Sequence, residues 1–171
     1  MDERNTLRID QNDRMDGMAW GCLTVMMIDR AGNVRPVAMR NTVVKGMYQF
    51  FLYNSQDVSE YAAKFVLGDE PAPTSFETVY SDMQPQYNQA FTSHVVDQVG
   101  LTETFIANVA FQDANGADPA GEYTYYEAAI VTDADRLLAR VAFRDEHGAI
   151  MGITKKLEYR IVFTWTVGWG F

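Results

Sequence analysis

The sequence predicts a mainly β fold, an antiparallel β-sandwich of about eight strands with one or two short helices. The first observation is composition, because ten Phe, nine Tyr and three Trp in 171 residues favour strands. The second is an alternation with a period of two near the C-terminus, typical of a strand with one buried face. There, one parity holds Tyr159, Ile161, Phe163, Trp165 and Val167, and the other holds Glu158, Arg160, Thr164 and Thr166. The third is a series of short apolar segments separated by turn residues.

The N-terminal part of the sequence predicts an arm followed by a hairpin. Residues 1–19 are mostly polar and mixed in charge, so we interpret them as an arm, and residues 20–171 as a single β-sandwich domain. Residues 20–28 and 34–39 have strand composition, and the turn residues between them predict a β-hairpin. Pro36 lacks a backbone N–H, which predicts that the second strand lies at a sheet edge.

The next segment has the pattern of an amphipathic helix over residues 43–52. Asn41 and Thr42 are good N-cap residues, and Gly46 lowers the helix propensity by about 1 kcal/mol relative to Ala. The apolar residues follow the spacing of one helix face, namely Val44, Met47, Tyr48, Phe51 and Leu52. A second, short helical turn is predicted within residues 74–83, which begin with two residues able to cap it.

Six further strands complete the predicted set of about eight. They cover residues 62–67, 86–96, 101–111, 123–131, 137–143 and 158–167, with turn and loop residues between them. After the last strand, Trp169 and Phe171 alternate with glycines close to the C-terminus. Aromatic side chains so near a chain end need cover, which a partner chain can supply. We therefore predict an interface that includes Tyr159, Trp165, Trp169 and Phe171.

Charge and cysteine content restrict the partners. The net charge of −9 and a pI of about 4.6 argue against direct contact with nucleic acid or an anionic membrane surface. The N-terminus has no apolar secretory segment, and no apolar run reaches the length of a membrane span, so synthesis in the cytosol is expected. Cys22 is the single cysteine, which excludes an intramolecular disulfide and a cysteine zinc site.

No motif predicts catalysis, a metal or a cofactor. His94 and His147 lack a second ligand at metal-binding spacing, and neither a phosphate-binding glycine loop nor a nucleophile elbow is present. Residues 10–17 fail the EF-hand pattern, because Arg14 stands where an oxygen ligand is needed. Residues 113–118 form a second acidic loop, for which we favour a simple turn over an ion site. The sequence predicts no enzyme.

Two alternative functions stay open at this stage. Tyr123, Tyr125 and Tyr126 can line a stacking platform for sugars, as in a monomeric receptor- or carbohydrate-binding β-sandwich. Asp133 and Asp135 can be combined into an unrecognised hydrolase site, the less favoured of the two. Packing in a core or an interface explains the tyrosines more simply.

Four short motifs, in order, resemble a family of small bacteriophage tail and tail-fibre proteins related to the N-terminal attachment region of tail-collar fibres. Together they span about residues 25–167, and each is a strand or turn pattern. Asp69, Ala129 and Lys156 differ from the family's usual residues. The motifs are Asp-Arg-Ala-Gly-Asn at 29–33 with Asn-Thr-Val-Val-Lys-Gly-Met at 41–47, Phe-Val-Leu-Gly-Asp at 65–69, Glu-Ala-Ala-Ile at 127–130 with residues 136–143, and Ile-Thr-Lys-Lys at 153–156 with residues 159–167.

The resemblance implies a structural component of the virion tail, in the tail, collar or baseplate region, without enzyme activity. It implies a homo-oligomer around a symmetry axis, such as a trimer or a hexamer-type ring, that binds neighbouring tail proteins. A polar arm at one end and exposed aromatic residues at the other suit such an assembly, because strands added across chains satisfy the hydrogen bonds of sheet edges.

Overall fold

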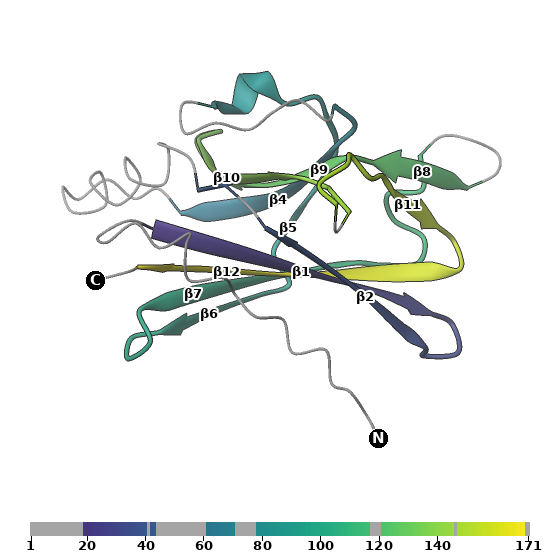
Figure 1. Ribbon diagram of the computed structural model, residues 1–171, viewed down its shortest axis with the longest axis horizontal. Helices are drawn as coiled ribbons and strands as arrows, with labels where there is room; N and C mark the ends of the chain where they lie inside the picture. The colour runs from purple at the N-terminus through teal and green to yellow at the C-terminus, as the bar shows by residue number, and fades with distance from the viewer. Residues whose placement is uncertain are drawn as a thin grey trace.

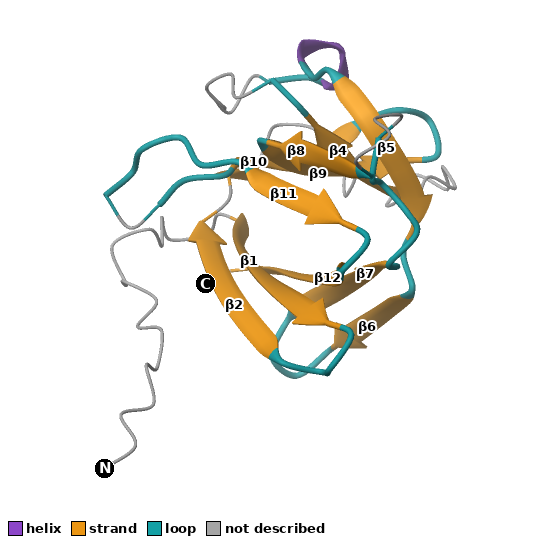
Figure 2. Cartoon of the chain, turned by 90° about the vertical axis from the view of Figure 1, so that its right-hand side faces the viewer, coloured by secondary structure: helices purple, strands orange, loops and turns teal. Residues whose placement is uncertain are grey.

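The computed structural model describes residues 19–40, 42–43, 61–70, 78–116, 121–145 and 147–169. Within these residues, twelve strands form two five-stranded sheets and one two-stranded sheet, and every paired strand is antiparallel. The two larger sheets face each other as the layers of a sandwich (Figure 1), and the small sheet lies at one end of it (Figure 2). The predicted mainly β sandwich is confirmed.

The first sheet has the strand order β2-β1-β12-β7-β6 and the second the order β3-β10-β9-β4-β5. The small sheet pairs β8 with β11. The strands of the first sheet are β1 (Ala19–Asp29), β2 (Val34–Arg40), β6 (Ser93–Asp97), β7 (Thr102–Val109) and β12 (Tyr159–Trp169). The others are β3 (Thr42–Val43), β4 (Ala62–Gly68), β5 (Pro85–Ala90), β8 (Glu122–Tyr125), β9 (Glu127–Thr132), β10 (Leu137–Ala142) and β11 (Ile153–Lys156).

Strand β12 is the centre of the first sheet. It pairs with β1 from Asp29 opposite Tyr159 to Ala19 opposite Trp169, and with β7 on its other side. Its alternating sequence produces alternating burial, since Ile161, Phe163, Trp165 and Val167 are buried and the side chains between them are partly exposed. The prediction from the C-terminal alternation is therefore confirmed, and the strand continues to Trp169.

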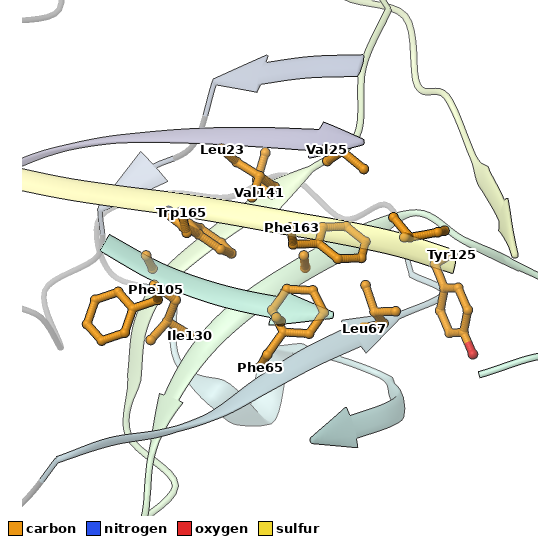
Figure 3. Packing of buried hydrophobic residues seen from close by; sticks show 14 of the residues in the cluster. Leu23, Val25, Phe65, Leu67, Phe105, Tyr125, Ile130, Val141, Phe163 and Trp165 are labelled. Carbon is orange, nitrogen blue, oxygen red and sulfur yellow. The ribbon is translucent and has the colours of Figure 1, made fainter. Parts of the chain in front are cut away.

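The core lies between the two sheets (Figure 3). Buried side chains from the first sheet meet buried side chains from the second, and the rings of Phe163 and Phe65 pack with centroids 4.6 Å apart. Burying this much aromatic and aliphatic surface is the main source of stability for such a fold. The labelled members of the cluster are Leu23, Val25, Phe65, Leu67, Phe105, Tyr125, Ile130, Val141, Phe163 and Trp165.

The middle of the second sheet is buried on both faces, whereas the edge strand β5 is largely exposed. Every residue of β9 is buried, which agrees with its nearly continuous apolar sequence. On the face away from the core, Val66, Ala129, Val131 and Leu137 pack against Met83. The segment that contains Met83 includes a 3₁₀ turn, η2 (Tyr80–Asp82), and covers this outer face of the second sheet (Figure 1).

Two predicted strands are each divided in the structure. The predicted strand 86–96 is two strands, β5 and β6, which belong to different sheets. The chain changes sheet at Phe91, whose ring packs against Phe65 of the second sheet and Phe105 of the first, with centroids 6.4 and 5.1 Å away. The predicted strand 123–131 is β8 and β9, separated at Tyr126. These two divisions raise the strand number from about eight to about ten, and β3 and β11, which lie outside the predicted strands, bring it to twelve.

The helix predicted over residues 43–52 is wrong at its start. Thr42 and Val43 form strand β3, paired with Arg140 and Ala139 of β10, because hydrogen bonding to the sheet edge prevails over the local helical pattern. Residues 44–52 lie outside the described residues, as do the predicted capping residues Thr74 and Ser75 and the arm up to residue 18. The short helical turn is present as η2.

Candidate interaction surface

The first sheet presents one face to the core and the other away from it. The side chains on this second face are partly exposed, and in Figures 1 and 2 no strand or turn of the described chain is layered over them. We call this surface the outer face, formed by Trp20, Cys22, Thr24, Met26, Ile28, Thr104, Ile106, Asn108, Val162, Thr164 and Thr166. These residues are uncharged, although the whole chain carries a net charge of −9.

Regular antiparallel pairing across the three longest strands of the first sheet builds the outer face. Thr24 lies opposite Thr164, and Thr166 lies opposite Thr104, with their hydroxyl oxygens 3.1 Å apart. β-Branched side chains pack well on such a pleated surface. Arg160, opposite Ile28, bounds the face at one end. The arrangement offers neutral, mostly apolar surface without any catalytic group.

At one side the outer face runs to an exposed edge strand, β6. Every residue of β6 is exposed, and Val95 and Val96 are each 54% exposed. The turn that follows carries Val99, which is 95% exposed. An edge strand with apolar side chains and free backbone groups is a ready site for another strand.

Local contacts fix this exposed hairpin. The ring of His94 stacks on Phe105 with centroids 4.5 Å apart, and its Nε2 lies 3.2 Å from a carboxylate oxygen of Glu103. Asp97 accepts the backbone N–H groups of Val99 and Gly100, each at 3.0 Å. These contacts hold the valines in a fixed orientation, which lowers the conformational-entropy cost of association.

The structure corrects the predicted interface residues. Trp165 is 1% exposed and lies in the core, so its assignment to an interface is wrong. Tyr159 is partly exposed at the start of β12, opposite Asp29. Trp169 ends β12 opposite Ala19, and Phe171 lies outside the described residues. The alternation of β12 predicted a buried face correctly, but burial comes from the second sheet of the same chain.

The edge strand β6 was not recognised in the sequence. Its residues were merged into the predicted strand 86–96, whose composition is continuous from β5 to β6. One signal was available: Val95 and Val96 are adjacent, which breaks the alternation expected of a strand with one buried face.

Of the three tyrosines considered for a sugar platform, Tyr125 is buried, whereas Tyr123 and Tyr126 are partly exposed. Tyr125 is 2% exposed, and its hydroxyl donates to the backbone oxygen of Ala114 at 2.8 Å, so burial raises the pKa of this phenol. The hydroxyl of Tyr123 donates to Asp69 at 2.7 Å, and the two rings pack with centroids 4.9 Å apart. These tyrosines close one end of the core.

The acids considered for a hydrolase have structural contacts. Asp133 accepts the backbone N–H of Tyr61 at 3.3 Å, and Asp135 forms an ion pair with Lys64 at 2.7 Å, which raises the pKa of Lys64. Both acids thus tie the turn after β9 to the start of β4.

Among the described residues, no three His, Cys, Asp or Glu side chains come together in a way that suits a metal ion. Nor does that part of the chain contain a helix long and apolar enough to span a membrane.

The described part of the acidic loop, residues 113–116, is fastened to the sandwich by a buried lysine. Lys155 of β11 is fully buried, and its Nζ donates to the backbone oxygens of Phe111 and Lys156 and to the amide oxygen of Asn115, at 2.9–3.0 Å. The three acceptors satisfy the three donors of an ammonium group. Burial lowers the pKa of Lys155 to about 8. The side-chain oxygen of Asn115 therefore accepts a hydrogen bond that holds the loop to β11.

This lysine gives a pH-dependent stability with a defined sign. In the unfolded chain its pKa returns to about 10.4, so between that value and about 8 the unfolded state binds more protons. The free energy of unfolding is then expected to rise with pH across this window. Urea titrations from about pH 7.5 to about 9, below the pH at which tyrosines titrate in the unfolded chain, should show the rise in the wild type and not in Lys155→Met. Lys156→Met is the control: ion pairing with Glu122 raises the pKa of Lys156, so removing it should leave the rise intact.

Comparison with known proteins returns no match to a protein-family model, to a curated protein or to a solved structure. The resemblance to tail and tail-fibre proteins stays a prediction, as does the absence of enzyme activity.

Proposed function

We propose that this protein is a structural component of a bacteriophage virion tail, in the tail, collar or baseplate region, that acts by self-association and by binding neighbouring tail proteins. The observation that carries the proposal is the uncharged outer face, which runs without interruption to the exposed edge strand β6. The four ordered motifs support the assignment to a tail.

A neutral sheet face on a strongly acidic protein favours association. Acidic residues elsewhere keep the subunit soluble, whereas the outer face lacks the charges that would have to be desolvated in an interface. Contiguous apolar surface of this kind marks protein–protein contacts. The outer face of the second sheet differs, because the segment around η2 already covers it within the same chain. Closed symmetry limits the size of the assembly.

The proposal is tested by the solution mass of the purified protein, measured by light scattering after size exclusion over a concentration series. We expect a closed oligomer, a trimer or hexamer among the possible sizes, that persists in 1 M salt because its contacts are not ionic. As a second readout, virions of the phage that encodes the chain should contain it at a fixed copy number by mass spectrometry. A monomer at every concentration, absent from virions, would contradict the proposal.

A further inference from the structure

We propose that β6 is the site at which a second copy of this chain adds, by antiparallel strand pairing about a two-fold axis at Val95. The pairing joins the five-stranded first sheets of two copies into one continuous sheet. This inference rests on the proposed function and narrows it, because a two-fold contact builds a dimer, or a hexamer with further axes, but not a trimer.

In the part of the chain that the structure describes, the edge strands of the two large sheets differ in how they resist strand addition. β2 carries Arg35 and Pro36, and proline interrupts the row of backbone donors along a strand. β5 begins with Pro85 and is otherwise largely polar, and β3 has two residues. β6 carries neither proline nor lysine, and its central residues are two exposed valines. By these criteria β6 is the least protected of the four edges.

The sequence of β6 is complementary to itself. A two-fold axis normal to the sheet requires one residue to lie opposite its own copy. With Val95 at the axis, Ser93 lies opposite Asp97, and His94 lies opposite Val96. Val95 then packs on Val95 of the second copy, and each Asp97 carboxylate meets a hydroxyl donor. With the axis at Val96, Asp97 would face the apolar Val95 and gain no hydroxyl donor across the contact, which makes that register less favourable.

The same geometry favours a closed pair over a filament. Pairing β6 of one copy with β2 of the next would build an open stack, but Pro36 prevents a complete ladder on β2. Val95 lies opposite Thr104, so it belongs to the same side of the sheet as the outer face. Two outer faces therefore merge into one longer, mostly uncharged surface with the Asp97 carboxylates at its seam, and this surface is available to other tail proteins.

A charge-swap experiment tests the two-fold register. Val95→Lys places two lysines opposite each other at the axis, and we expect the dissociation constant of the pair to rise at least about tenfold. Val34→Lys is the matched control, because Val34 is also 54% exposed but lies on β2, at the opposite edge of the same sheet. Mixing Val95→Lys with Val95→Glu brings opposite charges together at the axis, so the mixture should form heterodimers more tightly than either variant pairs with itself. Sedimentation velocity measures the wild type, the three variants and the mixture, and circular dichroism verifies that each protein is folded.

Each outcome has one meaning. Weakened pairing in Val95→Lys, recovery in the mixture and wild-type behaviour of Val34→Lys support the inference. A wild type that associates while Val95→Lys associates equally well overturns the β6 site and leaves the proposed function standing. Loss of pairing in Val95→Lys without recovery in the mixture overturns the two-fold register. A wild type that stays monomeric at every concentration overturns the self-association in the proposed function and this inference with it.

Discussion

Replacing Arg140 with Met is expected to destabilise the folded chain by about 3–5 kcal/mol at neutral pH. Arg140 and Glu127 are both fully buried, on the outer face of the second sheet, and Nε of Arg140 donates to a Glu127 carboxylate oxygen at 2.6 Å. The other oxygen of Glu127 accepts the backbone N–H of Gln84 at 3.4 Å, from the segment that covers this face. Without Arg140, a buried carboxylate has no compensating charge.

The pH dependence of this loss has a definite sign. Burial raises the pKa of Glu127 above its ordinary value, and Arg140 opposes that rise. Removing Arg140 raises the pKa further, so the folded variant holds a proton that the unfolded chain releases. The stability of the variant should therefore recover as the pH falls through this window. We expect the difference from the wild type, measured by urea unfolding, to shrink between pH 7.5 and pH 5.

A double variant separates the lost charge from the lost packing. In Glu127→Leu with Arg140→Met no charge remains, and replacing a buried ion pair by apolar side chains is often neutral or stabilising. The guanidinium Nη1 has no partner among the described atoms, so the native pair is incompletely satisfied. We expect the double variant to be close to the wild type. A double variant as unstable as Arg140→Met, or a loss below about 1 kcal/mol in the single variant, would contradict the ion-pair argument.

The sequence predicted the strands better than their contacts. The alternation in β12 is a local pattern, and the structure reproduces it residue by residue. The Arg140–Glu127 pair was not predicted, because it forms only when β9 and β10 pair in a register that brings Arg140 opposite Ala129. A charged residue in an apolar run indicates neither its partner nor the segment that covers it.

Local sequence patterns do not show tertiary contacts, which also explains the two errors at the candidate surface: the assignment of Trp165 to an interface and the missing division between β5 and β6. Alternation shows that one face of a strand is buried, but not whether its own chain or a partner buries it, so Trp165 was assigned to an interface. The division between β5 and β6 depends on Phe91 packing between both sheets, which is a tertiary contact. The exposed edge strand follows from that division, and sequence periodicity alone does not place it.

Trp165→Ala is expected to cost about 3–5 kcal/mol of folding free energy, a large share of the 5–15 kcal/mol typical of a domain. Trp165 heads the fully buried side chains by volume and lies on the central strand, opposite Leu23 of β1 and Phe105 of β7. Figure 3 shows its ring between the two sheets. Truncation leaves a cavity that rigid neighbouring strands cannot fill. Urea unfolding measures the loss.

Trp165→Phe is the matched control. Phe keeps most of the apolar volume and removes the indole N–H, which has no hydrogen-bond partner among the described atoms. An unpaired buried donor costs about 1–3 kcal/mol, so removing it offsets part of the free-energy cost of the smaller cavity that Phe leaves. We expect this variant to be clearly more stable than Trp165→Ala.

The protein concentration then distinguishes a core residue from an interface residue. If Trp165 stabilises the fold of each chain, the loss in Trp165→Ala persists at concentrations where the wild type is dissociated. If it belonged to an interface, the variant would remain folded and lose association, and its stability would match the wild type once both were dissociated. The second result, or a loss below about 1 kcal/mol, would contradict the placement of Trp165 in the core and with it the register of β12.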